Sequence, residues 1–175
     1  MSEPLTGLPP RIGGACRVLV LGSMPGGASL QAAQYYAHPR NRFWPVMQRV
    51  CGVPAALAYE ARVAALERAG VGLWDVIGRC RRRGSLDAAI ERGSEEPNTV
   101  AGLLHDRPGI AAVALNGGKA ASAFRRHILP CVPAARLETL AVLALPSTSP
   151  AHAAMDLERL VQAWSPLRGF LASLA

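Results

Sequence analysis

The sequence predicts an α/β fold in which a mostly parallel four-stranded sheet lies between two layers of helices. Two observations predict this class: four short apolar runs recur along the chain, and helical patterns lie between them. Parallel strands need long crossover connections, which helices supply, so the alternation favours a three-layer α/β/α sandwich. The chain has 175 residues, half of them apolar, which is enough for one domain with a substantial core.

The elements follow in chain order. Apolar runs that predict strands cover Arg17–Leu21, Val71–Ile77, Ile110–Leu115 and Leu140–Leu145. Helices are predicted over Asn41–Val50, Ala56–Ala69, Lys119–Leu129 and Asp156–Leu174, the last interrupted near Ser165 and Pro166. Pro130–Glu138 has a mixed pattern and is expected to be loop. Residues 1–16, rich in Pro and Gly, are expected to form a loose leader, and residues 17–175 a single domain.

The charge of the chain favours a polyanionic partner. The net charge is +7 with a pI near 10.1, and neutralising phosphates supplies most of the non-specific affinity for nucleic acids.

No run approaches the roughly 18 apolar residues that a membrane helix needs. The N-terminus lacks the basic start and apolar stretch of a secretory signal. We therefore expect a soluble, cytoplasmic protein, associated with the nucleoid in a prokaryote, with no membrane partner.

The four cysteines do not form a metal-binding pattern. Cys16, Cys51, Cys80 and Cys131 are widely spaced, with no Cys-x-x-Cys pair. Iron–sulfur clusters usually take at least two ligands from one short loop. The sequence therefore predicts incidental thiols, no metal and no cofactor.

The segment Gly22–Trp44 carries the strongest functional signal. It follows the first apolar run, and loops at the carboxyl ends of strands are where open α/β sheets place their sites. It concentrates aromatic and hydrogen-bonding side chains, which suit a nucleobase, although a turn before an ordinary amphipathic helix is the alternative. Met24 occupies the place of the second glycine of a dinucleotide fingerprint, and no Gly-Lys-Ser/Thr follows, so neither common nucleotide-binding loop fits.

This segment resembles the first active-site region of the uracil-DNA glycosylase superfamily. The matching residues are Gly22-Ser23-Met24-Pro25-Gly26 and Tyr35-Tyr36-Ala37-His38-Pro39-Arg40-Asn41-Arg42-Phe43-Trp44, which are most similar to the hypoxanthine-DNA (deoxyinosine) glycosylase branch. The segment Leu145–His152 resembles the second motif of the superfamily. Between the two, Gly72–Ile77, Gly84–Asp87 and Leu115–Gly117 fall in the expected order, so the likeness runs from about Arg17 to about Leu174.

The resemblance implies a monofunctional DNA glycosylase. Such an enzyme hydrolyses the N-glycosidic bond of a deaminated base in base excision repair, here most of all hypoxanthine. Mismatch-directed uracil or thymine excision is an alternative, and so is a catalytically inactive DNA- or nucleotide-binding protein on the same fold. The implied partner is double-stranded DNA with a damaged or mismatched base, or single-stranded DNA, bound by a monomer. A lyase would need an amine nucleophile, and nothing in the sequence places the sole lysine, Lys119, at the site.

The implied catalytic residues are Asn41 and Ser23. Many superfamily members carry an acid or amide at the position of Ser23 to orient the attacking water. Because Ser23 lacks that group, the resemblance gives the role to Asn41, which can position a water without acting as a strong base. The alternative is that Asn41 caps the following helix.

The implied base pocket combines an aromatic platform with groups that read the base edge. Phe43 is expected to stack under the flipped base, and Asn116 to pair with a lactam through its amide donor and acceptor. An ordinary Asn-Gly turn is the alternative for Asn116. The remaining expected base-binding residues are Met24, Pro25, Tyr36 and His38.

The second motif and an arginine cluster are expected to contact the DNA backbone. Short hydroxyls and basic groups suit phosphates, and the expected contacts are Ser147, Thr148, Ser149, His152 and Arg82. By this resemblance, Ser147 occupies the position of the superfamily's motif histidine, and Ala151 replaces the usual larger wedge residue. A plain turn is the alternative for the loop, and a solvated face for the arginines. Asp75 and Asp87 invite an acid–base interpretation, but capping or salt-bridge roles explain them equally well.

Overall fold

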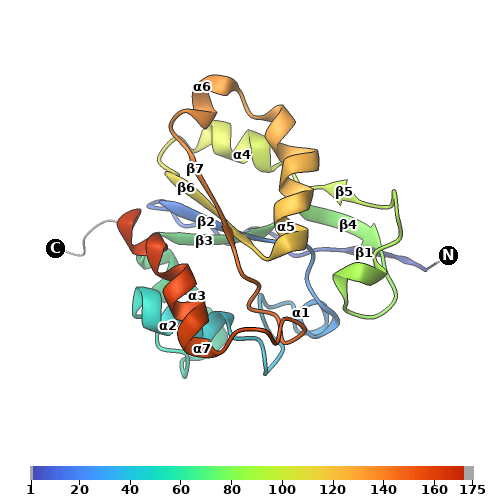
Figure 1. Ribbon diagram of the computed structural model, residues 1–175, viewed down its shortest axis with the longest axis horizontal. Helices are drawn as coiled ribbons and strands as arrows, with labels where there is room; N and C mark the ends of the chain where they lie inside the picture. Colours follow the sequence, from blue (N-terminus) through green and yellow to red (C-terminus); the bar gives the residue numbers. More distant parts are fainter. Residues whose placement is uncertain (1, 172–175) are drawn as a thin grey trace.

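The computed structural model describes residues 2–171 and has a parallel sheet at its centre (Figure 1). Its four strands lie in the order β3-β2-β6-β7, and each neighbouring pair is parallel. The strands are β2 (Val18–Gly22), β3 (Val71–Asp75), β6 (Ala112–Asn116) and β7 (Ala141–Leu145). All four predicted strands are therefore present, with ends that shift by two residues at most.

Helices cover both faces of this sheet, which confirms the predicted α/β class. On one face lie α2 (Phe43–Cys51), α3 (Tyr59–Arg68) and α7 (Leu157–Trp164), and on the other lie α4 (Val100–Asp106), α5 (Gly118–Ala123) and α6 (Ala134–Leu137) (Figure 1). The short helix α1 (Gly27–Ala32) follows β2 at the carboxyl edge of the sheet.

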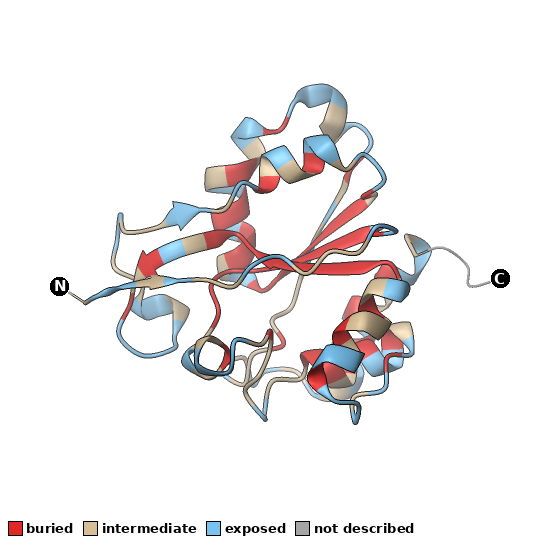
Figure 2. Cartoon of the chain, turned by 180° about the vertical axis from the view of Figure 1, so that it is seen from behind, coloured by how far each residue is buried: buried red, intermediate tan, exposed pale blue. Residues whose placement is uncertain are grey.

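The alternation of side chains along β2 explains why the sheet lies between two cores. Val18 and Val20 belong to the core under α2, α3 and α7, whereas Leu19 and Leu21 belong to the core under α4 and α5. Successive side chains of a strand point to opposite faces, so a strand that is apolar at every position must be covered on both sides. All five residues of β2 are buried (Figure 2).

A second sheet, which the sequence did not predict, corrects the expectation of a loose leader. β1 (Pro4–Thr6) pairs antiparallel with β4 (Ile77–Arg81), which also pairs with β5 (Glu96–Pro97). Further along the N-terminal segment, Arg11 exchanges backbone hydrogen bonds with Leu73. Residues 4–11 are therefore held against the domain by backbone hydrogen bonds, which proline and glycine content does not reveal.

The predicted strand Val71–Ile77 is divided between the two sheets. β3 ends at Asp75, and the backbone N–H groups of Val76 and Ile77 then donate to the carbonyls of Gly22 and Ser23. Beyond this point β4 pairs with β1 instead of β2. A continuous apolar run cannot reveal such a change of partner, because both halves are buried.

The helices differ from the predictions mainly in their extent. The predicted helix Lys119–Leu129 begins as α5 and continues as a π-helical turn over Phe124–Ile128. The predicted helix Asp156–Leu174 consists of α7 and a 3₁₀ turn over Ser165–Gly169, and its last residues lie outside the described residues. The sequence analysis missed α1, α4 and α6. Within residues 2–171, no helix is long and apolar enough to cross a membrane.

Candidate active site

The carboxyl ends of three parallel strands meet at one cavity. Gly22 ends β2, Asp75 ends β3 and Asn116 ends β6, and all three line a cavity of about 680 Å³. The loop after β2 supplies one wall, and the loop Ser147–His152 after β7 supplies another. This is the edge at which open α/β sheets bind ligands, because strand ends leave a crevice that the loops enclose.

Arg42 joins the two motif loops, although they are more than 100 residues apart in sequence. Its backbone N–H donates to the carbonyl of Thr148 at 3.0 Å. Its guanidinium donates to the carbonyls of His152, at 2.7 Å, and Met155. A planar guanidinium can hold several carbonyls at once, so Arg42 fixes the second loop against the first. The sequence analysis gave Arg42 no role, because its partners are backbone atoms that only the fold brings near.

Asn41 lines the cavity and also accepts the first backbone N–H of α2, from the position before the N-cap residue Arg42. Its Oδ1 accepts a hydrogen bond from the backbone N–H of Phe43 at 2.9 Å. This contact orients the amide, and its Nδ2 makes no hydrogen bond within the described part of the chain. A carbonyl oxygen has a second lone pair, so the capped amide can still accept a hydrogen bond from a water in the cavity. Capping and water positioning are therefore compatible at Asn41.

Ser23 faces the same cavity, where it is held by a carboxylate. Its hydroxyl contacts both oxygens of Asp87, at 2.8 and 2.7 Å. A hydroxyl that donates to a carboxylate keeps its oxygen lone pairs available to a water. Burial raises the pKa of Asp87, whereas the hydrogen bond from Ser23 opposes that rise. Asp87 thus orients Ser23, a contact that the sequence order did not disclose.

The aromatic wall of the cavity is Tyr36, and the expectation that Phe43 forms the platform is corrected. Phe43 is completely buried and lies outside the set of cavity-lining residues. The ring of Tyr36 stacks on Phe43, with centroids 4.0 Å apart, and lines the cavity itself. The backbone of Tyr36 is left-handed, with φ of 54°, which is unusual for a bulky residue and common at functional sites. Phe43 therefore supports the platform from below.

Asn116 and Thr148 form a locked pair across two strand ends. Asn116 donates through Nδ2 to the Thr148 hydroxyl at 3.0 Å and accepts from the Thr148 backbone N–H at 3.0 Å. Thr148 is completely buried, so the expectation that its hydroxyl contacts DNA phosphates is wrong. The pair fixes the orientation of the Asn116 amide, which keeps one hydrogen and one lone pair for a ligand in the cavity.

The other hydroxyls and histidines predicted from the motifs surround the mouth of the cavity. Ser147 and Ser149 each accept a backbone N–H two residues ahead, and both are half-buried. His38 accepts the backbone N–H of Arg40, and His152 is half-buried. All four line the cavity. Met24 and Pro25 line it as well, although Met24 is also part of the core beneath.

Arg82 is a buried residue that supports a loop through hydrogen bonds, and the expectation that it contacts DNA is wrong. Only 3% of the residue is exposed. Its guanidinium donates to the carbonyls of Pro25, at 2.6 Å, and Gly84, at 2.9 Å. Since Pro25 lies in the first motif, Arg82 holds that loop against the chain after β4. A sequence cluster of arginines gives no indication of which member turns inward.

Asp75, like Asp87, lines the cavity and was weighed by the sequence analysis but not selected. It is almost fully buried at the carboxyl end of β3, and no partner for its Oδ2 exists within residues 2–171. Burial, and then the charge of Asp87, raise the pKa of Asp75 to about 7. No local signal marked its position, because Asp75 lies inside the predicted apolar run Val71–Ile77, whereas Gly22 and Asn116 directly follow theirs.

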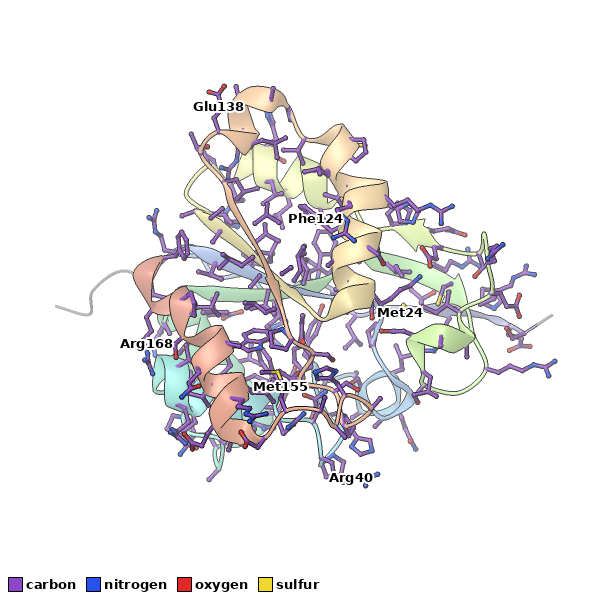
Figure 3. The ribbon with its side chains drawn as sticks, viewed as in Figure 1. Met24, Arg40, Phe124, Glu138, Met155 and Arg168 are labelled. Carbon is purple, nitrogen blue, oxygen red and sulfur yellow. The ribbon has the colours of Figure 1, made fainter. Side chains whose placement is uncertain are left out.

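Exposed side chains complete the rim. Leu86 is 59% exposed and lines the cavity, on the segment that precedes Asp87. Arg40 is exposed and also lines it, and Figure 3 shows Arg40 projecting outward beneath the loops that follow β2 and β7.

Lys119, in contrast, is ion-paired with Glu95 and is not one of the described cavity-lining residues. No metal-binding cluster of His, Cys, Asp and Glu occurs within the described part of the chain.

A family model described as the uracil DNA glycosylase superfamily matches residues 9–168, which is most of the chain. The protein belongs to the uracil DNA glycosylase superfamily. This confirms the resemblance that the two motifs carry, and the superfamily match includes the whole cavity, from Gly22 to His152.

Individual relatives within the superfamily agree with this assignment. A hypoxanthine DNA glycosylase from Methanosarcina barkeri is 38% identical over 114 residues, which cover 65% of this chain and 71% of the relative. A protein of the same name from Methanosarcina acetivorans is 38% identical over 104 residues, covering 59% and 65% respectively. The solution NMR structure of a candidate uracil DNA glycosylase from M. acetivorans matches with a TM-score of 0.76 and 27% identity, over 96% of this chain and 99% of that one.

Proposed function

We propose that this protein is a monofunctional DNA glycosylase that releases hypoxanthine from deoxyinosine in base excision repair. The observation that carries the proposal is the convergence of both motif loops on one cavity with Asn41, Tyr36 and Asn116 in its walls. The curated relatives named hypoxanthine DNA glycosylase support the choice of base. A cavity of about 680 Å³ accommodates a purine.

The reaction requires an extrahelical base, an oriented water and a stabilised leaving group. The flipped base stacks on Tyr36, and the free hydrogen and lone pair of Asn116 read its lactam edge. As the N-glycosidic bond breaks, positive charge develops on the sugar. A water held by Asn41 and Ser23 then attacks the anomeric carbon. The amide and the hydroxyl need only orient the water, because the sugar cation is itself a strong electrophile.

The cavity mouth engages double-stranded DNA around the damaged nucleotide. Arg40, Ser147, Ser149 and His152 contact phosphates, and the net charge of +7 adds general attraction. Leu86 inserts into the base stack in place of the extrahelical base, because an exposed leucine at the mouth is the residue best suited to fill that gap. The protein acts as a monomer on cytoplasmic, nucleoid DNA and uses no metal or cofactor.

Two alternatives correspond to specific features of the site. Mismatch-directed uracil or thymine excision would use the same aromatic wall and amide. A catalytically inactive DNA-binding protein would explain why Ser23 occupies the place of the usual acid or amide.

One assay distinguishes these functions. Purified protein is incubated in excess with duplex and single-stranded oligonucleotides that contain inosine, uracil, xanthine or a thymine mismatch, and abasic sites are then cleaved with alkali. We expect fastest cleavage at inosine, and preferential cleavage at uracil or thymine would favour the mismatch alternative. DNA binding without cleavage of any substrate would support the inactive alternative and contradict the proposal.

A further inference from the structure

Two buried polar groups converge on the same part of the cavity wall without a partner. A Cβ placed on Gly22 would lie 2.4 Å from Oδ1 of Asp75 and 3.5 Å from the hydroxyl of Tyr36. A side chain at position 22 would therefore displace the Asp75 carboxyl group, whereas the Tyr36 hydroxyl lies at an ordinary contact distance. Within the described residues, Oδ2 of Asp75 makes no hydrogen bond, and the Tyr36 hydroxyl makes none of normal geometry, although the Asn116 amide lies near enough to oppose the rise of the Tyr36 pKa.

Such groups are costly unless a ligand satisfies them. A buried polar group without a partner costs roughly 1–3 kcal/mol, so two in one place are unusual in a folded protein. Both residues line the cavity, and Asp75 comes from a different strand end than the loop that carries Tyr36. The fold thus places an unpartnered carboxyl group beside the Tyr36 ring, where a base stacked on that ring could satisfy it.

The charges around Asp75 favour its neutral, protonated form near neutral pH. The ionisable groups that face it are Asp87, Tyr35 and Tyr36, and none of them is a cation. The guanidinium of Arg82 does not pair with Asp75, because it donates to the backbone carbonyls of Pro25 and Gly84. His38 and His152 also line the cavity, and neither is among the groups whose charge shifts the pKa of Asp75. Burial and the repulsion from Asp87 raise the pKa of Asp75 to about 7.

The second motif leaves the departing base without its usual hydrogen-bond donor. Negative charge accumulates on the base as the glycosidic bond breaks, and a donor aimed at that charge accelerates the reaction. Ser147 stands where the motif often carries a histidine, and its oxygen already accepts the N–H of Ser149. A neutral carboxyl group held in an apolar site is a strong donor, whereas a carboxylate would repel the anionic base.

We propose that Asp75, as a neutral acid beside the Tyr36 hydroxyl, donates a hydrogen bond to a ring nitrogen of the flipped purine and protonates it as it leaves. The inference rests on the proposed glycosylase function. Both electrons of the C1′–N9 bond pass to the base, which takes the proton of Asp75. Water forms the new bond to C1′, and the proton that it loses restores the acid. The products are neutral hypoxanthine and an abasic site.

Single-turnover kinetics on inosine-containing duplex DNA between pH 5.5 and 9 test this role. We expect the parent rate to fall as the pH rises through about 7, because the acid form is lost. Asp75→Asn keeps a donor but cannot transfer a proton, so its rate should be lower by about 10²-fold at pH 6, at the lower end of the usual range for lost acid catalysis, and nearly independent of pH. The control is Asp106→Asn, an exposed aspartate on α4, which should keep the parent profile.

A measurement that does not depend on catalysis accompanies the kinetics. The protein has four aspartates, so carbon-13 labelling of their carboxyl groups gives a small set of NMR signals to titrate. The signal absent from Asp75→Asn should titrate near pH 7. Titration of that signal below pH 5 overturns the inference even if Asp75→Asn is inactive or unstable.

The possible failures are distinguishable. If the parent protein releases none of the four bases, the proposed function fails and the inference with it. If the parent releases hypoxanthine and Asp75→Asn keeps both its rate and its pH profile, only the role of Asp75 is overturned. A parent rate that rises through pH 7 would also overturn it, because the carboxylate would then be the active form.

Discussion

At the scale of single residues, the site depends on how a few polar groups are held. Asn41 is fixed by the N–H of Phe43, Ser23 by Asp87, and Asn116 by Thr148. Each contact occupies one hydrogen-bonding position and leaves another for the substrate or water. Preorganised groups lose less entropy when the reaction begins, so this arrangement favours catalysis by positioning.

Substitution of Asn41 tests whether its cavity role exceeds its capping role. Asn41→Ala should lower the single-turnover rate of base release by about 10²–10³, similar to the loss of one transition-state donor. Asn41→Asp should keep more activity, because aspartate also caps the Phe43 N–H and can hold the water.

Thermal unfolding of both variants provides the control for this experiment. Loss of the cap alone costs about 1 kcal/mol and would leave the rate nearly unchanged. Folded Asn41→Ala with the parent rate would therefore identify Asn41 as a cap only.

Asp75 should also make stability depend on pH. Its pKa rises from 3.8 to about 7 on folding, a shift of about 3 units, which corresponds to about 4 kcal/mol. Because the folded pKa is the higher one, the stabilisation by the bound proton is fully present below about pH 4 and is lost as the pH rises to about 7. Asp75→Asn should therefore gain stability relative to the parent over this interval. Urea unfolding at several pH values measures the difference, and a constant difference would contradict the assigned cause.

At the scale of elements, the mouth of the cavity is built by loops that the buried strands hold in place. Arg42 clamps the loop after β7, and Arg82 clamps the loop after β2. These buried contacts leave Leu86 and Arg40 on the exposed rim, where side chains can meet DNA.

Leu86 should contribute to opening the duplex. Burying a leucine side chain is worth about 1.5–3 kcal/mol, so Leu86→Ala should lower affinity or base release by about tenfold or more. Leu57→Ala is the matched control, because Leu57 is also exposed but does not line the cavity. Fluorescence of 2-aminopurine next to inosine reports on base unstacking. Equal behaviour of the two variants would exclude the wedge role.

Arg40 should contact a phosphate. Arg40→Ala should weaken DNA binding to a similar degree for all sequences and reduce the slope of log affinity against log salt by about 1. Arg68→Ala is the control, since Arg68 is exposed near the start of β3, at the opposite edge of the sheet. Titrations at several salt concentrations measure both slopes, and an unchanged slope for Arg40→Ala would contradict the contact.

At the scale of the whole molecule, a net charge of +7 accompanies a cavity at the carboxyl edge of the sheet. The only lysine is ion-paired with Glu95, which also contacts His127 at 2.9 Å. An ion-paired, protonated amine is a poor nucleophile, and this one is not among the residues that line the cavity.

The protein should therefore release the base without cutting the strand. Borohydride added during turnover should trap no covalent protein–DNA adduct, and the strand should break only after alkali. Lys119→Ala should leave base release unchanged if the protein is folded. An adduct that disappears in Lys119→Ala would identify a lyase instead.

The sequence by itself determined the sheet, its two helical layers and the edge of the sheet at which the cavity lies. Buried apolar runs separated by helical patterns allow few arrangements, and the residues that follow such runs lie at one edge. Asn41, Ser23, Tyr36 and Asn116 could be named because local motifs carry them.

Only the tertiary structure decided which neighbours these residues have. In the structure, Phe43 lies beneath Tyr36 and Thr148 bonds to Asn116. Arg82 is buried against the carbonyl of Pro25, and no cation shifts the pKa of Asp75. The physical reason is that burial, hydrogen-bond partners and pKa depend on contacts between distant segments, such as Asp75 with Gly22, which no local pattern encodes.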